Sequence, residues 1–131
     1  MARILIYGTD ENIAHKLSQT MQKEGYSTQI CDAFTTLPAP IDEPTLVLLD
    51  ARLKWAVCRP LFSQIQALSY PVLFMTADKE MTSHLRALYR GQSDVLMLPF
   101  SPRTAVGKVI AVCQQVGILK VGFLTQPPAN N

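Results

Sequence analysis

Five short apolar segments alternate with longer stretches in which apolar residues recur at helical spacing. Residues 46–49 are apolar at consecutive positions, which is typical of a central parallel strand that is covered on both faces. Alternation of short strands with helices predicts an α/β fold built on a parallel sheet. The predicted strands are residues 3–7, 27–31, 45–49, 72–75 and 95–98.

Helix signals lie between most of these strands. Ile13, Leu17 and Met21 are four residues apart, with Thr9 as the candidate N-cap and Gly25 as the stop signal. The predicted helices are residues 11–24, 59–68, 79–90 and 102–116.

The stretch between the second and third strands departs from this regular order. Three prolines within residues 38–44 leave room for one or two helical turns at most, around residues 34–37. The second of five expected helices is therefore predicted to be degraded.

The composition is that of an ordinary folded domain. Apolar residues make up 48% of the 131 residues and charged residues 17%, which excludes a disordered segment. The net charge of +2 is spread along the chain, so we expect no direct contact with nucleic acid. No apolar run approaches the ~18–20 residues that cross a membrane. Three separated cysteines favour reduced, buried thiols, and we expect a cytoplasmic protein with no membrane contact.

The length fits one domain, which is predicted to cover residues 1–119. Residues 120–131 contain two consecutive prolines and end in two asparagines. They are predicted to be a C-terminal tail or the start of a linker.

Three sequence blocks at the ends of predicted strands carry a family resemblance. They are LVLLDARL at 46–53, FMTA at 74–77 and GQSDVLMLPFSP at 91–102. Their order and spacing resemble the receiver domain of two-component response regulators, over residues 1 to about 116. The resemblance implies a flavodoxin-like (CheY-like) doubly wound sheet of five parallel strands in three α/β/α layers. It also implies that Asp50 is the candidate phosphoacceptor and Thr76 the candidate switch hydroxyl.

Other positions depart from the pattern of that family. Gly8 and Thr9 stand where the family has two acids that hold magnesium, and Leu98 stands where it has a lysine. Val95 replaces the switch aromatic. One acid of three then remains, so we expect poor magnesium binding and little compensation of charge on a phosphorylated Asp50.

Two substitutes for the missing groups remain open. A shift of two residues would make Asp10 and Glu11 the acidic pair, and Arg52 or Lys54 could take the place of the lysine. The departures predict an atypical receiver, or pseudo-receiver, that is not an enzyme. It is expected to need no cofactor, with Mg²⁺ binding only weakly if at all, and to act mainly through protein–protein contacts.

The last predicted helix is apolar on more than one side, which suggests a partner in addition to the sheet. The interface candidates are Val106, Val109 and Ile110. By resemblance, a homodimer is expected through the surface formed by residues 79–90, 95–98 and 102–116. The alternative is that residues 121–124 of the same chain cover this helix.

The resemblance also implies a histidine kinase, or another signalling protein, as partner. Two other functions remain open. The domain is either a conventional switch that is phosphorylated at Asp50, or the regulatory part of a transcription factor whose DNA-binding domain is absent from this chain.

Overall fold

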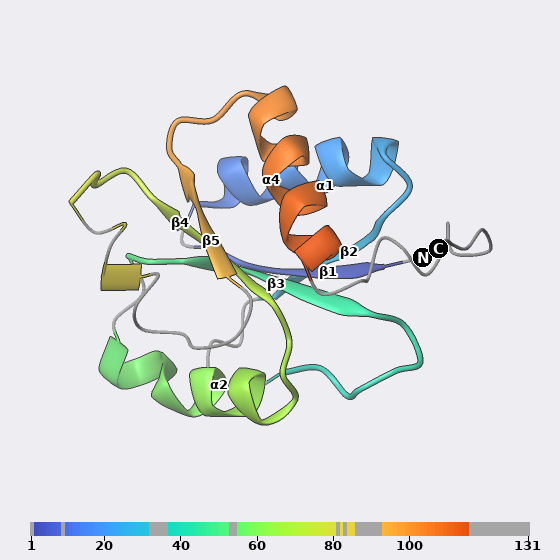
Figure 1. The fold of residues 1–131 in the computed structure, drawn as a ribbon, viewed down its shortest axis with the longest axis vertical. Coiled ribbons are helices and arrows are strands. Elements are labelled where there is room, and N and C mark those ends of the chain that lie inside the picture. Colours follow the sequence, from blue (N-terminus) through green and yellow to red (C-terminus); the bar gives the residue numbers. More distant parts are fainter. Residues whose placement is uncertain are drawn as a thin grey trace.

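A parallel sheet with strand order β2-β1-β3-β4-β5 forms the centre of the molecule (Figure 1). The structure is a computed structural model that describes residues 2–8, 10–31, 37–52, 55–80, 82, 84–85 and 93–115, with the backbone alone at 55–58 and 114–115. The strands are β1 (Arg3–Tyr7), β2 (Ser27–Cys31), β3 (Thr45–Asp50), β4 (Val72–Thr76) and β5 (Ser93–Met97). All neighbouring strands pair in parallel, which confirms the predicted flavodoxin-like sheet.

Helices cover both faces of the sheet. Helices α1 (Glu11–Lys23) and α4 (Pro102–Gln115) lie on one face, and α2 (Trp55–Ala67) lies on the other (Figure 1). Among the described residues of the predicted helix at 79–90, Thr82, His84 and Leu85 are helical. The three predicted layers are thus present.

Each face of the sheet carries its own hydrophobic cluster. Strands β1, β3 and β4 are buried at every position, as expected of central parallel strands. Because successive side chains of a strand point to opposite faces, Ile4 and Ile6 pack beneath α1 and α4, whereas Leu5 and Tyr7 pack beneath α2. Full burial of one such aliphatic side chain contributes about 1.5–3 kcal/mol.

The start of α1 differs from the prediction. Asp10, rather than Thr9, is the N-cap, and its Oδ1 accepts the backbone N–H groups of Asn12 at 2.9 Å and Ile13 at 3.3 Å. These two donors have no partner within the helix, and a carboxylate at this end also interacts favourably with the helix dipole. Thr9 lies outside the described residues. Gly25 follows the helix with a φ of 93°, which confirms the predicted stop.

Two further boundaries differ from the prediction. Helix α2 begins at Trp55, one turn earlier than predicted, and Pro60 lies inside it. Proline fits the helical φ, and its missing N–H costs the helix one hydrogen bond. Strand β5 ends at Met97, so Leu98 lies just beyond it, in a cis peptide bond with Pro99.

The degraded second helix and the C-terminal tail are described only in part or not at all. Residues 37–44 contain no helix, in agreement with the prolines of this stretch, and residues 32–36 lie outside the described part. The predicted tail at 120–131 also lies outside it. No helix in the described ranges is long and apolar enough to cross a membrane.

Candidate functional site

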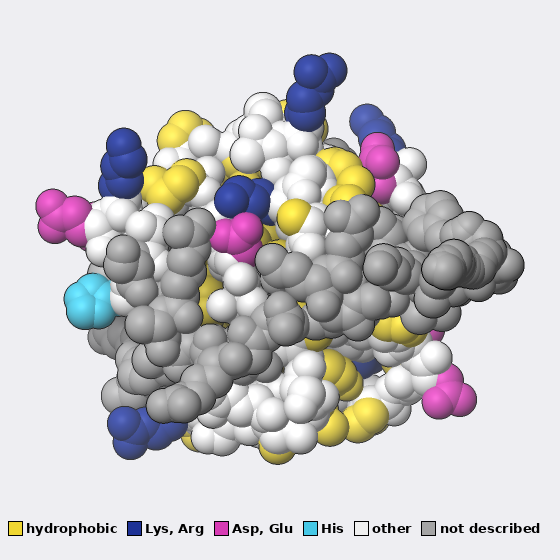
Figure 2. All heavy atoms as spheres, viewed as in Figure 1, with side chains coloured by type: hydrophobic (Ala, Val, Ile, Leu, Met, Phe, Trp, Pro, Cys, Tyr) yellow, Lys and Arg dark blue, Asp and Glu magenta, His cyan; other side chains and the backbone are white. Residues whose placement is uncertain are grey.

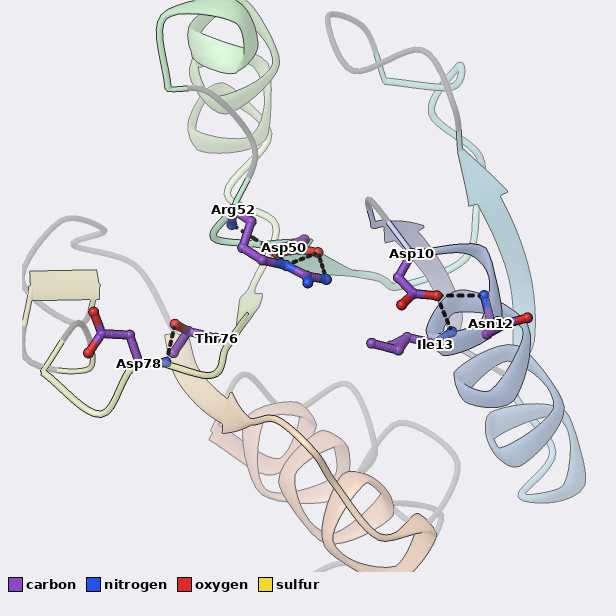
Figure 3. A network of polar contacts seen from close by, with 7 residues as sticks. All are labelled: Asp10, Asn12, Ile13, Asp50, Arg52, Thr76 and Asp78. Carbon is purple, nitrogen blue, oxygen red and sulfur yellow. Dashed lines mark hydrogen bonds and ion pairs between the residues drawn. The ribbon is translucent and has the colours of Figure 1, made fainter.

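Three polar side chains lie along the carboxyl edge of the sheet. Asp50 is the last residue of β3, Thr76 is the last residue of β4, and Asp10 follows β1 (Figure 3). Strands β1, β3 and β4 are direct neighbours, so their carboxyl ends lie side by side. In doubly wound sheets this edge is where ligands bind. The predicted phosphoacceptor and switch hydroxyl are therefore brought to one place.

The carboxylate of Asp50 is bound by the guanidinium of Arg52. Arg52 Nη2 donates to Asp50 Oδ2 at 2.8 Å, and Nε lies 3.1 Å from Oδ1 and 3.2 Å from Oδ2 (Figure 3). The backbone N–H of Arg52 also donates to Oδ1 at 2.8 Å. This arrangement uses both carboxylate oxygens in a forked, charge-assisted contact.

Burial makes this ion pair unequal. The Asp50 side chain is 3% exposed, whereas that of Arg52 is 49% exposed. A carboxylate that is removed from water needs a compensating charge, and Arg52 supplies it from two residues away. The hydrogen bond to Asp50 is the main cause that raises the pKa of Arg52 above its usual value; partial burial opposes this shift, and the charges of Asp50 and Asp10 add to it. The guanidinium therefore stays protonated.

The other polar groups at this edge bind the backbone. Thr76 Oγ1 accepts the backbone N–H of Asp78 at 3.0 Å, and Asp10 caps α1 (Figure 3). Glu11, the second acid of the shifted pair, is exposed on α1. The Thr76 hydroxyl and the Asp10 and Asp50 carboxylates thus accept backbone N–H groups of two turns and of the N-terminus of α1.

The remaining predicted site positions supply no charge. Leu98 packs partly against the cluster beneath α1 and α4, and Val95 is buried in the cluster beneath α2. A Cβ atom at Gly8 would lie 4.0 Å from the Cβ of Ala14, so the backbone there leaves room for a side chain. Of the two proposed substitutes for the lysine, Arg52 contacts Asp50, and Lys54 lies outside the described residues.

These residues do not fit a divalent cation bound in the manner that the resemblance implies. Mg²⁺ prefers several oxygen ligands in octahedral geometry. Within the described ranges, no three His, Cys, Asp or Glu side chains are grouped to hold a metal ion. Both oxygens of Asp50 already face the guanidinium of Arg52.

The predicted interface residues on α4 differ in burial. Val109 is fully buried in the cluster beneath α1 and α4, so its prediction as an interface residue is wrong. Val106 is partly buried and lines a groove between these two helices with a volume of about 370 Å³. Ile110 is partly exposed and belongs to neither core cluster. The outward side of α4 therefore includes Ile110.

Comparison with known proteins relates this geometry to one family. No protein-family model matches the chain. The chain is 30% identical over 115 residues to the DNA-binding response regulator MtrA of Mycolicibacterium paratuberculosis, which covers 83% of this chain and 50% of that protein. The homologues of this chain are response-regulator receiver domains. The chain spans about half the length of the response regulators that it matches.

Solved response regulators share the fold. A two-component response regulator from Clostridium difficile superposes with a TM-score of 0.68 at 22% identity, over 88% of this chain and 98% of that one. The chemotaxis protein CheY4 of Vibrio cholerae gives a TM-score of 0.67 at 20% identity, over 86% of this chain and 98% of that one. At these identities the likeness establishes the fold alone.

Proposed function

We propose that this chain is an atypical receiver domain of two-component signalling, which acts mainly through protein–protein contacts and is phosphorylated weakly or not at all. The observation that carries the proposal is the bidentate contact of Arg52 with Asp50. A phosphoryl group on this carboxylate would have to displace the guanidinium, at a place where Leu98 offers no replacement cation. Phosphoryl transfer depends on such electrostatic compensation.

The other parts of the proposal rest on the same site and on the relatives. With Gly8 in place of an acid and Asp10 engaged as a helix cap, Mg²⁺ is expected to bind weakly, and the domain is proposed to be neither an enzyme nor dependent on a cofactor. Its proposed partners are a histidine kinase or another signalling protein, and a second copy of the chain. We propose a cytoplasmic location, as for other receivers.

The proposal is tested by the response to a small phosphodonor. The purified chain is incubated with acetyl phosphate and Mg²⁺, and its intact mass is measured over time beside that of Asp50→Asn. We expect no lasting mass increase in either protein, whereas a receiver with the complete acid set and lysine serves as the positive control. A stoichiometric increase that maps to Asp50, and is absent from Asp50→Asn, would instead establish the conventional switch.

A second candidate role follows from the length of the relatives. The first relative described above is a DNA-binding protein about twice as long as the aligned part. This favours the alternative that the domain is the regulatory part of a longer transcription factor. On the face in Figure 2, basic side chains are dispersed among acidic ones over the described residues. In such a longer protein, we propose that a further domain would bind the DNA. The isolated chain is expected not to bind duplex DNA in a mobility-shift assay at low salt.

A further inference from the structure

We infer that Arg52 is a built-in counter-ion that closes the carboxylate of Asp50 to external cations. This inference rests on the proposed function and concerns the control of the same site. Weak metal binding at Asp50 would then have two causes: the acids that are missing after β1, at Gly8 and Thr9, and the guanidinium of Arg52.

The geometry supports a closed site. Asp50 is almost fully buried, and the guanidinium of Arg52 occupies both of its oxygens from the exposed side. A divalent cation needs those same oxygens as ligands. It would therefore have to displace Arg52 and lose three short contacts between the guanidinium and the carboxylate.

The backbone holds Arg52 in this place. The N–H of Ala51 donates to the carbonyl of Met75 at 2.8 Å, which extends the pairing of β3 with β4 by one residue. The N–H of Arg52 itself donates to Asp50 Oδ1, which closes the turn that brings the guanidinium back onto the carboxylate. A planar guanidinium on such a fixed turn loses little further freedom when it binds.

The charge balance also favours the internal cation. Asp10 adds to the negative potential at Arg52, and its own carboxylate caps α1. Thr76, at the end of β4, accepts the backbone N–H of Asp78. Arg52 thus brings a positive charge onto both oxygens of Asp50, and we expect its removal to make these oxygens more accessible to an external cation.

Binding of Mn²⁺ to the wild-type chain and to variants tests this inference. Free Mn²⁺ is followed by its electron paramagnetic resonance signal during titration of the wild type, Arg52→Gln and Arg52→Ala. Glutamine keeps an amide donor for the buried carboxylate, so Arg52→Gln retains a folded comparison if Arg52→Ala is unstable. Arg103→Ala, which removes an exposed arginine at the start of α4, is the matched control.

We expect the Arg52 variants to bind Mn²⁺ at least about tenfold more tightly than the wild type and Arg103→Ala. The gain should disappear in Arg52→Gln/Asp50→Asn, because the new site requires the Asp50 carboxylate. Equal affinity in the wild type and in folded Arg52→Gln, or a gain that persists without Asp50, would overturn the inference. Either result leaves the proposed function standing, whereas lasting phosphorylation of the wild type would refute that function whatever the Mn²⁺ titration shows.

Discussion

Burial controls the chemistry of single ionisable residues in the layer formed by α1 and α4. Cys113 is fully buried in this layer, and desolvation raises the pKa of its thiol to about 11. Tyr26 lies in the same cluster, and its pKa is raised to about 12, first by burial and then by the charges of Cys113 and Glu24. Both groups are therefore neutral in the folded protein well above neutral pH, and neither thiol nor phenol is activated.

This burial predicts a loss of stability in alkaline solution. The folded pKa of Cys113 lies above its ordinary value of 9.0, so its contribution is complete below about pH 9 and is lost as the pH rises through about 11. The difference corresponds to about 3 kcal/mol of unfolding free energy. In Cys113→Ala, the free energy of unfolding measured by urea denaturation should fall less steeply between these pH values. This variant should also be less stable than the wild type at neutral pH. An unchanged slope would show that the thiol is not buried as described.

The roles of single residues were only partly predictable from the sequence. Thr9 and Asp10 are adjacent residues that both favour an N-cap, and only the geometry of α1 selects Asp10. The spacing of Asp50 and Arg52 made a contact conceivable, but the forked geometry depends on the turn and on the side-chain rotamer. The apolar residues of α4 extend over more than one side of the helix. The spacing of apolar residues alone therefore could not predict that Val109 faces the core.

At the scale of elements, strands were easier to predict than helix ends. Strands β1 and β2 match their predicted bounds. β1 is buried at every position, as an apolar central strand should be, whereas β2 is a more polar edge strand that is buried only at Cys31. Helix α2 was predicted over residues 59–68 from the spacing of Leu61, Ile65 and Leu68, but it begins at Trp55, one turn earlier. Helix α4 was placed within one residue.

Gly107 lies inside α4, where a glycine lowers the stability of the helix. Gly107 is exposed, and a Cβ atom built there would have no neighbour within 4 Å. Gly107→Ala is expected to raise the free energy of unfolding by about 0.5–1 kcal/mol, because alanine restricts the unfolded chain and suits the helix. The matched control is Gly25→Ala, which should destabilise the fold because Gly25 has a φ of 93°. Chemical denaturation compares both variants with the wild type, and a loss of stability in Gly107→Ala would contradict the described helix surface.

At the scale of the whole molecule, α4 packs one side against the core and leaves its other side partly exposed. The inward side of α4 is occupied by Ala105, Val109 and Val112, so the monomer has a closed core. The partly exposed Ile110 lies outside that core. The proposed homodimer must therefore use the outward side of α4 together with its neighbouring strand, and it would need about 1,000 Å² of total buried surface to be specific.

The proposed dimer predicts a specific effect of a charge on this surface. Wild-type protein should sediment as a dimer without phosphorylation at tens of micromolar, and Ile110→Glu should sediment as a folded monomer, because the charge is buried only in the dimer. Gln66→Glu, on the exposed side of α2, is the matched control and should remain dimeric. Val109→Glu, by contrast, should unfold the domain. A monomeric wild type would refute the dimer and leave the site argument unchanged.

The most direct test of the central claim is the nuclear magnetic resonance signal of the Arg52 Nε–H group. This proton is held between the two oxygens of Asp50, and its signal can be assigned by its loss in Arg52→Gln. The account predicts one shifted, slowly exchanging signal that stays in place when millimolar Mg²⁺ and acetyl phosphate are added, and that moves in Asp50→Asn. A signal that shifts or exchanges with water once the donor and Mg²⁺ are present would mean that Asp50 leaves Arg52 to be phosphorylated, which contradicts the account.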